Sequence, residues 1–395
     1  MSEKKKALVT GACGFVGSHI IDILVEDDEY EEVIATDLES ADRSHLEDKD
    51  VEFRPADFTT PKTIDKILDE DIDIIFNPAA AFNYEMPMQI MKKINVEGGR
   101  NFAEAVVRNV EDLDIFVHVS TGEIYGYNMF GKSEQLDEDG HFREVESKTP
   151  GNAPYAKTKK LQEEEIWDLH EEEGLPVVDM RLGTVYGTGL FFARLVNLFI
   201  DLASLGRFPD NINFRWPLVH VEDVASAAKF LAEKGDEVVG EAFNIVDEQE
   251  YILSDMVYKV ADYMDMEVKD IPNIPPLSKI WNLVPKGELV EDILDEAYPE
   301  YQEQVEDRYD DDVWMKYNHA GPYARLLLNQ MPKWDDDFTY SNKSLKELGW
   351  KPKYESFLEA IPEIIEWSKE NGYLVENPGL KHLITKALIS DPSEA

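Results

Sequence analysis

The sequence is poor in cysteine and in positive charge, and both shortages restrict what the protein can be. Cys13 is the single cysteine among 395 residues, so a disulfide within the chain and a zinc site built on cysteines are excluded. The 39 basic residues stand against 82 acidic ones, which gives a formal net charge of −43. A chain with this charge repels nucleic acid and anionic membrane surfaces, so we expect neither as a partner.

Long apolar runs are also missing. The N-terminal "MSEKKKALVTGACGF" has only a short apolar run before its glycines, and no stretch approaches the roughly 18 to 20 apolar residues of a membrane span. The apolar fraction of 43% is nevertheless that of a protein with a sizeable core. We therefore expect a globular, cytoplasmic enzyme or binding protein.

The acidic residues are spread along the chain, in segments such as "EDDEYEE" and "QEEEIWDLHEEEG", and form no single tail. This distribution is typical of a hydrated acidic surface. It suggests an acidic proteome adapted to high salt more than a catalytic role for these runs.

The first half of the chain alternates short apolar runs with helical patterns, which predicts repeated βα units and a parallel sheet. The expected strands cover 6–10, 31–37, 51–57, 72–80, 113–120 and 175–183, and the expected helices cover about 15–27, 61–70, 88–109 and 155–174. The pattern predicts an α/β fold with a Rossmann-type doubly wound parallel sheet over 1–187, to which strands and a helix return at about 217–247. A smaller C-terminal α/β substrate domain is expected over 188–375, followed by a loosely held tail over 376–395.

Three glycines follow the first expected strand, in "VTGACGFVGSHI". Gly11 permits a tight turn, Gly14 lets the backbone approach a pyrophosphate, and Gly17 allows close packing of helix against strand. The helix N-terminus then presents free N–H groups and the positive end of its dipole to the phosphates. Phe15 and Val16, which lie between the glycines, belong to the same expected cofactor contact.

An acidic residue closes each of the second and third expected strands. Asp37 stands 20 residues after Gly17, where a carboxylate can hydrogen-bond the adenosine ribose and repel the 2′-phosphate of NADP; a turn residue at a strand end is the alternative. Asp57 can reach the adenine amine, or it can belong to a helix N-terminus before "TTPKT". With Ala79, which follows the fourth strand, these residues define an expected site for NAD.

Tyr155 and Lys159 are four residues apart on one expected helix, so their side chains share a face. The phenol can exchange a proton with a carbinol oxygen, but its ordinary pKa of about 10 is too high for efficient work at neutral pH. The Lys159 ammonium would lower that pKa and could also hold the nicotinamide ribose. An ordinary surface pair is the alternative, and the fifth strand, which ends in Ser120 and Thr121, argues against it.

Taken in order, the motifs "TGACGFVG", Asp37, Asn95 in "NVEGG", "STGEIYG", "YAKTK", "RLGTVYG" and "PLVHVEDVA" resemble the extended short-chain dehydrogenase/reductases, and more narrowly the NAD-dependent epimerase/dehydratase family. The resemblance covers about residues 6–250 and the segment "FTYSNKSLKELGW" with its closing helix. It implies a Rossmann domain that binds NAD, a smaller substrate domain, and often a homodimer built from the helices at about 97–110 and 155–173.

Carried over residue by residue, the resemblance implies that Thr121, Tyr155 and Lys159 form the catalytic set. Ser120 is the neighbouring hydroxyl and ranks below Thr121. Asn95 matches an asparagine that braces the sheet near the active site, so its implied role is architectural.

The chain departs from the family pattern beside Thr121. In family members that dehydrate or decarboxylate nucleotide sugars, a carboxylate at the position of Glu123 can serve as acid or base, so Glu123 is a candidate catalytic residue. The alternative is a carboxylate that caps or pairs at the mouth of the site. The dehydratases also carry an aspartate where this chain has Gly122, and its absence argues against a 4,6-dehydratase.

Other departures concern the substrate. Thr184 stands where sugar-nucleotide epimerases tend to carry a diphosphate-binding asparagine, and Arg215 lies one residue out of the usual register with His220. Both weaken the expectation of a nucleotide diphosphate. We expect His220 to be a packed strand residue more than a catalytic base, and we expect no metal site.

Apolar patches at about 275–283 and 321–331, together with Phe191 and Phe192, have two interpretations. They are either ordinary packing of the smaller domain or a lid over an apolar alcohol, which would resemble the 3β-hydroxysteroid-dehydrogenase-like branch of the superfamily.

Three functions therefore remain open. The first is NAD-dependent hydride transfer at a secondary alcohol or ketone of a small sugar-like substrate, as in sugar or nucleotide-sugar epimerases. The second is an oxidoreductase that acts on an apolar alcohol. The third is a catalytically silent NAD-binding regulator, and the complete Thr-Tyr-Lys set argues against it.

Overall fold

The computed structural model describes residues 4–82, 86–125, 134–138, 153–189, 195–203, 206–208, 210, 217–248, 252–270 and 338–371. Phe191, Phe192, Arg215, the apolar patches at 275–283 and 321–331, and the expected tail over 376–395 lie outside these residues.

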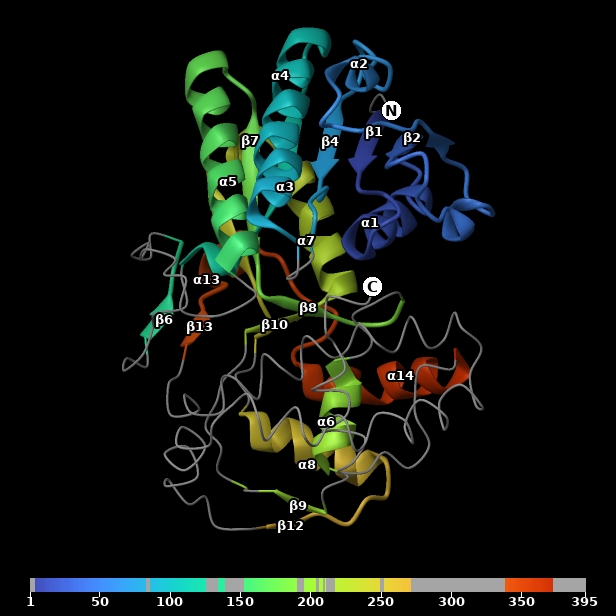
Figure 1. The fold of residues 1–395 in the computed structure, drawn as a ribbon, viewed down its shortest axis with the longest axis vertical. Coiled ribbons are helices and arrows are strands. Elements are labelled where there is room, and N and C mark those ends of the chain that lie inside the picture. Colours follow the sequence, from blue (N-terminus) through green and yellow to red (C-terminus); the bar gives the residue numbers. More distant parts are fainter. Residues whose placement is uncertain are drawn as a thin grey trace.

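A seven-stranded parallel sheet lies at the centre of the molecule's larger part (Figure 1). Its strands are β1 (Lys5–Thr10), β2 (Tyr30–Thr36), β3 (Glu52–Phe53), β4 (Ile74–Asn77), β5 (Ile115–Thr121), β7 (Val177–Leu182) and β11 (Ala242–Ile245). They are ordered β11-β7-β5-β4-β1-β2-β3, so the chain winds outward from β1 in one direction and from β4 in the other. This is the predicted Rossmann-type doubly wound sheet, and its topological switch point lies between β1 and β4.

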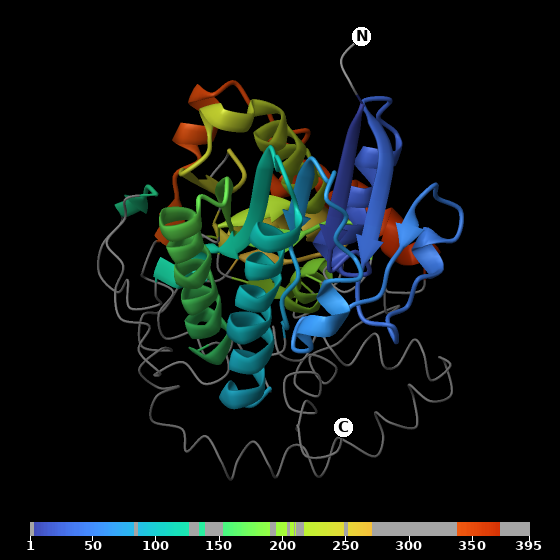
Figure 2. The ribbon, with the colours of Figure 1, turned by 90° about the horizontal axis from the view of Figure 1, so that it is seen from above.

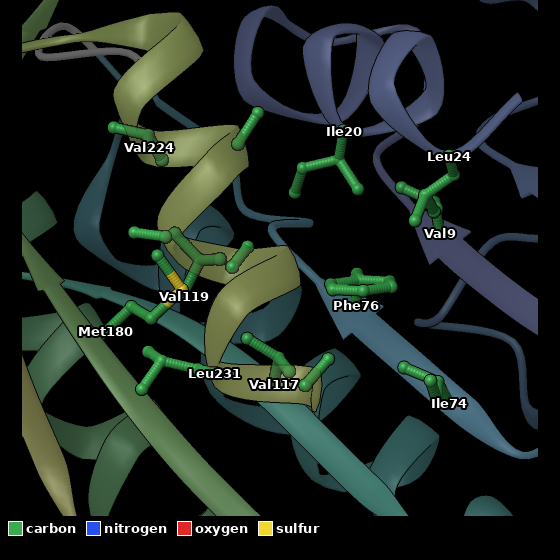
Figure 3. Packing of buried hydrophobic residues seen from close by; sticks show 14 of the residues in the cluster. Val9, Ile20, Leu24, Ile74, Phe76, Val117, Val119, Met180, Val224 and Leu231 are labelled. Atoms are coloured by element: carbon green, nitrogen blue, oxygen red, sulfur yellow. The ribbon is translucent and has the colours of Figure 1, made fainter. Parts of the chain in front are cut away.

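Helices cover both faces of the sheet (Figure 2). Helices α1 (Phe15–Val25) and α7 (Val221–Lys234) pack on one face, and α4 (Gly99–Asn109) and α5 (Ala153–Glu173) pack on the other. Figure 3 shows Ile20 and Leu24 of α1 beside Val9 and Phe76 of the sheet. Because the strands are buried on both sides, their sequences are continuous apolar runs, which is what made them recognisable.

Two predicted elements differ from the structure. The expected third strand 51–57 is reduced to β3, and the expected helix 61–70 is reduced to α2 (Pro61–Ile64). Beyond α2 the chain turns so that Asp69 and Asp71 bind the Lys6 ammonium, at 2.7 and 3.1 Å. These ion pairs depend on tertiary contacts that a local pattern does not contain.

The expected helix 88–109 has the predicted extent but not a regular course. It comprises α3 (Met88–Lys92), the wide π-helical segment η2 (Lys93–Gly98) and α4. At Gly99 a Cβ would lie 2.7 Å from the Gln162 side-chain nitrogen of α5, so glycine lets the two helices approach closely. The wide segment carries Asn95, which is fully buried.

A second apolar core lies below the sheet in Figure 1. It is formed by α6 (Leu195–Ala203), α8 (Leu253–Tyr263) and α14 (Phe357–Glu370) around side chains such as Phe199, Val257 and Ile361. Two short parallel pairs accompany it, β8 (Thr184–Tyr186) with β10 (Leu218–His220), and β9 (Arg207–Phe208) with β12 (Lys269–Asp270). The division into domains at 187/188 stays a prediction.

The C-terminal segment returns to the sheet before it enters α14. β13 (Phe338–Tyr340) pairs in parallel with β6 (Glu134–Leu136), and α13 (Lys343–Glu347) packs near β11. Leu345 and Trp350 join the apolar core of the sheet. Short turns complete the described elements: η1 (Ser44–Leu46), η3 (Gly122–Tyr125) and η5 (Gly235–Glu237). Among the described helices, none combines the length and apolar character needed to cross a bilayer.

Candidate active site

The glycine loop lies at the carboxyl end of β1, where ligands of open α/β sheets bind. Gly11 has a φ of +53°, a conformation that favours glycine, and a Cβ there would lie 3.1 Å from Cα of Ala79 at the end of β4. At Gly17 a Cβ would lie 2.8 Å from the Gly11 carbonyl carbon, so only glycine lets α1 approach the loop this closely. The three expected residues thus meet in one tight turn.

The N-terminus of α1 is suited to a diphosphate. Gly14 precedes the helix and is exposed, and no side chain caps the helix there. The first turn, which begins with Phe15 and Val16, has no acidic residue. Free N–H groups and the helix dipole therefore face solvent without a competing negative charge, and these residues fit NAD.

Asp37 follows β2 and braces the glycine loop. Its carboxylate accepts hydrogen bonds from the backbone N–H of Cys13 at 3.0 Å and of Leu38 at 2.7 Å. It is half-buried, so one side remains open to a ribose. Burial, and after it the Asp37 charge, raises the pKa of the Cys13 thiol to about 11.

Asp57 is satisfied within its own turn. Its carboxylate accepts hydrogen bonds from the Thr59 N–H at 2.9 Å and the Thr59 hydroxyl at 2.7 Å, and its N–H donates to the Thr63 hydroxyl. The Thr59 hydroxyl is also the main reason that the Asp57 pKa is lowered. This geometry agrees with the helix N-terminal alternative, and a contact with adenine stays a prediction.

Asn95 connects the sheet to α5. Its side-chain oxygen accepts from the Ala81 N–H at 2.7 Å, and its amide nitrogen donates to the Ala81 carbonyl at 3.2 Å and to the Thr158 hydroxyl at 3.1 Å. The loop after β4 is therefore fixed to the helix that carries Tyr155. This is the architectural role that the resemblance implied.

Lys159 is buried beneath the end of β5. Its ammonium donates to the Val119 carbonyl at 2.8 Å and to the Gln162 side-chain oxygen. Burial lowers its pKa to about 8, against the opposing charges of Asp179 and Glu163. Lys159 is thus anchored to the strand that ends in Thr121.

Tyr155 lies one turn earlier on α5, with its ring edge-on to Phe82 at 4.9 Å between centroids. The sequence predicted that Lys159 would lower the Tyr155 pKa. In the structure burial, followed by the charge of Glu123, raises this pKa instead. The phenol therefore carries its proton at neutral pH.

Thr121 is the last residue of β5, and Glu123 lies in the following turn η3. The Glu123 N–H donates to the Thr121 hydroxyl at 3.2 Å, and the Glu123 charge is the second cause, after burial, of the raised Tyr155 pKa. Thr121, Glu123, Tyr155 and Lys159 are thus brought together at the carboxyl end of β5. Their individual catalytic roles stay predictions.

A buried ion pair behind the site was missed from the sequence. The Arg181 guanidinium donates to Glu163 at 2.6 and 3.1 Å, and the Ser120 hydroxyl donates to the other Glu163 oxygen at 2.5 Å. Glu163 lies in "QEEEIW", an acidic run expected to be hydrated, yet it is only 4% exposed. The sequence feature that could have indicated a buried ion pair is Arg181, a charged residue inside the largely apolar strand "VVDMRL". Because Ser120 is held by Glu163, Thr121 is the hydroxyl that remains for the site.

His220 has a packing and capping role. It is fully buried, it precedes α7, and its Nδ1 accepts a hydrogen bond from the Glu222 N–H at 3.3 Å. Burial lowers its pKa to about 3, so the ring stays neutral. Thr184, one of the substrate-related departures, begins β8, and its N–H donates to the Pro217 carbonyl.

A doubly wound parallel sheet with a glycine turn at its switch point is typical of the Rossmann class of nucleotide-cofactor proteins. The profile of the NAD dependent epimerase/dehydratase family matches residues 7–246. The chain belongs to this family, which confirms the predicted family, the enzyme class and NAD as the cofactor.

Relatives come from several kingdoms. A trifunctional UDP-glucose 4,6-dehydratase/3,5-epimerase/reductase of Arabidopsis thaliana is 28% identical over 69% of this chain and 42% of its own length. The mouse dTDP-D-glucose 4,6-dehydratase is 25% identical over 93% of this chain and 89% of its own. The solved UDP-glucuronic acid 4-epimerase of Bacillus cereus in complex with NAD is 18% identical, with a TM-score of 0.64 over 93% of this chain and all of that one. The chain spans less than half the length of the trifunctional plant relatives that it matches.

Proposed function

We propose that the protein is an NAD-dependent epimerase that oxidises and re-reduces a secondary alcohol on the sugar of a nucleotide sugar. The observation that carries this proposal is the meeting of Thr121, Tyr155 and Lys159 at the end of β5, at the same carboxyl edge of the sheet as the glycine turn. Relatives that act on UDP- and dTDP-sugars support the substrate class, although Thr184 departs from their usual pattern.

Separate groups of residues would bind the cofactor and the substrate. The backbone N–H groups in the first turn of α1 would hold the NAD diphosphate, and Asp37 would bind the adenosine ribose hydroxyls. When bound, NAD accepts and returns a hydride. Lys159, fixed to β5 by the Val119 carbonyl, would hold the second ribose and supply a positive charge below the reacting atoms.

The proton moves through Tyr155. Its phenol would exchange a proton with the carbinol oxygen of the substrate, while the Thr121 hydroxyl donates a hydrogen bond to the same oxygen. In the structure, burial and then the Glu123 charge retain the proton on the Tyr155 phenol. The positively charged nicotinamide of bound NAD would favour the phenolate and so let Tyr155 accept a proton.

Epimerisation is favoured over 4,6-dehydration by Gly122. Elimination of water requires an acid that protonates the departing hydroxyl group. The residue between Thr121 and Glu123 is a glycine and supplies none.

The test is product analysis with UDP-glucose and dTDP-glucose as substrates. We expect nuclear magnetic resonance to find a sugar of inverted configuration, with no NADH accumulating in the absorbance record. A product that has lost water would identify a dehydratase. Turnover of an apolar alcohol with accumulation of NADH, and none with either sugar nucleotide, would contradict the proposal in favour of the oxidoreductase alternative.

We further propose a homodimer through α4 and α5, and a cytoplasmic location in a cell that accumulates salt. Support for the dimer comes from the resemblance to family members that often pair through helices at these positions, and α4 and α5 lie side by side on one face of the sheet. Support for the location comes from the single cysteine and the net charge of −43. Sedimentation equilibrium at high salt tests the dimer, and a monomer mass would contradict it.

A further inference from the structure

The ring of Tyr340 occupies the space beside Gly122. A Cβ at Gly122 would lie 2.7 Å from the Tyr340 hydroxyl oxygen and still closer to two ring carbons. Gly122 separates Thr121 from Glu123, so the ring rests on the short backbone stretch that carries both candidate site residues. Tyr340 comes from β13, near the other end of the chain.

Neighbouring groups hold this ring in place. Tyr340 is 4% exposed and packs with Tyr125 and Val246 in a small apolar cluster, with the two tyrosine rings 5.4 Å apart between centroids. β13 pairs with β6, and just beyond it the Asn342 amide donates to the Val246 carbonyl at 2.9 Å. The ring therefore cannot swing away without loss of buried contacts.

The carboxylate of Glu123 acts on two phenols at once. Burial is the larger cause of the raised pKa of both Tyr155 and Tyr340, and the Glu123 charge is the next cause for both. Both phenols therefore interact electrostatically with the same carboxylate. Tyr125 also faces Tyr340, and Glu123 is the charged group found to act on Tyr155 in the described part of the chain.

We propose that Tyr340 is a positioning residue of the active site, whose ring supports the backbone at Gly122 and holds the Glu123 carboxylate beside the Tyr155 phenol. The inference rests on the proposed function, because turnover provides its readout. It means that the C-terminal segment completes a site whose other members come from β5, η3 and α5. Loss of the ring frees the 122–123 backbone, and a displacement of about 1 Å near reacting groups can cost on the order of 100-fold in rate.

The test compares the pH profiles of kcat/KM for the wild type, Tyr340→Ala, Glu123→Gln and the double variant, each with NAD bound. On the acid side of this profile, activity falls as Tyr155, which must accept a proton, becomes protonated, so the position of this limb reports the Tyr155 pKa. The Glu123 charge raises that pKa. Glu123→Gln should move the limb to lower pH, and Tyr340→Ala should move it in the same direction and lower kcat about 10- to 100-fold. The double variant should shift no further than Glu123→Gln alone. Tyr340→Phe, which keeps the ring, should retain the wild-type profile.

An acid limb that stays in place in Tyr340→Ala, or shifts that simply add in the double variant, would overturn the inference. So would equal effects of Tyr340→Phe and Tyr340→Ala. If Tyr340→Ala does not fold, Tyr340→Leu and Gly122→Ala take its place, since an added Cβ at Gly122 displaces the ring and should produce the same shift.

The proposed function is tested separately by Tyr155→Phe. An active Tyr155→Phe enzyme would refute that function, whereas an inactive one combined with silent Tyr340 variants would refute only the role of Tyr340.

Discussion

At the scale of the residue, Lys159 is a charged side chain inside the protein. The residue is 1% exposed, and its ammonium donates to the Val119 carbonyl and Gln162. Burial lowers the pKa to about 8, while Asp179 and Glu163 oppose this effect. The positive charge of Lys159 is therefore present at neutral pH and is lost above about pH 8.

A stability measurement can detect this charge without any substrate. The folded-state pKa of Lys159 lies below its ordinary value of 10.5, so the unfolded chain binds more protons between about pH 8 and pH 10.5. The free energy of unfolding contributed by Lys159 must then rise with pH across this window. Urea unfolding should show the wild type gaining up to about 3 kcal/mol relative to Lys159→Met between these limits.

Lys351→Met, at an exposed position, is the matched control for the loss of a lysine. Curves for the wild type and Lys159→Met that stay parallel across the window would show that the Lys159 pKa is not lowered by folding.

The site residues that could be predicted are those whose partners are near in sequence. Tyr155 and Lys159 share one helix, and the three glycines share one loop, so spacing alone indicated their roles. Tyr340 could not be predicted, because its partner Gly122 is far away in the sequence and only folding brings them together. Glu163 was misjudged for the same reason, since its partner Arg181 lies on a different element.

At the scale of the element, the contact between the glycine loop and α1 is the feature on which cofactor binding depends. A Cβ at Gly17 would lie 2.8 Å from the Gly11 carbonyl carbon. Because the Gly11 carbonyl is part of the backbone, it cannot rotate away from the added methyl group as a flexible side chain would. Gly17→Ala should therefore reduce the free energy of unfolding by about 1 to 3 kcal/mol and weaken NAD binding, as measured by thermal unfolding and titration calorimetry.

Gly235→Ala is the matched control. Unlike Gly17, which lies in a helix, Gly235 has a positive φ of +52°, and among the described residues nothing lies within 4 Å of an added Cβ. It should cost about 1 to 2 kcal/mol from backbone strain and leave NAD affinity unchanged. Normal NAD affinity in Gly17→Ala would contradict the assignment of this loop to the cofactor.

The elements of the sheet were predictable because each is a short apolar run that ends in turn residues. The wide turn η2 within the expected helix 88–109 was not, because one additional residue per turn leaves the apolar pattern nearly unchanged. The early end of α2 at Ile64 was not predictable either, since the carboxylates that follow it bind Lys6 and Arg54.

At the scale of the whole molecule, the net charge of −43 destabilises the compact state through self-repulsion. Salt screens this repulsion, with a Debye length that falls from about 10 Å at 0.1 M to about 3 Å at 1 M. Circular dichroism should therefore show the thermal midpoint rising as KCl increases over this range. A midpoint that falls or stays constant would contradict the proposal of a protein adapted to salt.

The C-terminus of α5 offers a sharper version of this experiment. Glu171, Glu172 and Glu173 are exposed there, where the helix dipole also disfavours negative charge. Replacing all three with glutamine should raise the thermal midpoint at low salt and reduce its salt dependence. Equal salt dependence in the triple variant and the wild type would indicate that ion-specific effects, and not screening, are responsible.

The central claim is that Tyr155 carries the proton in an NAD-dependent reaction on a sugar nucleotide, and Tyr155→Phe tests it most directly. Its control is Tyr258→Phe, because the Tyr258 hydroxyl donates only to the Phe208 carbonyl within the second core in the described contacts. Turnover of UDP-glucose and NAD affinity should be measured for both variants. We predict that Tyr155→Phe loses at least about 100-fold in kcat while its NAD affinity stays close to that of the wild type, and that Tyr258→Phe changes neither. Full turnover in Tyr155→Phe would contradict the account.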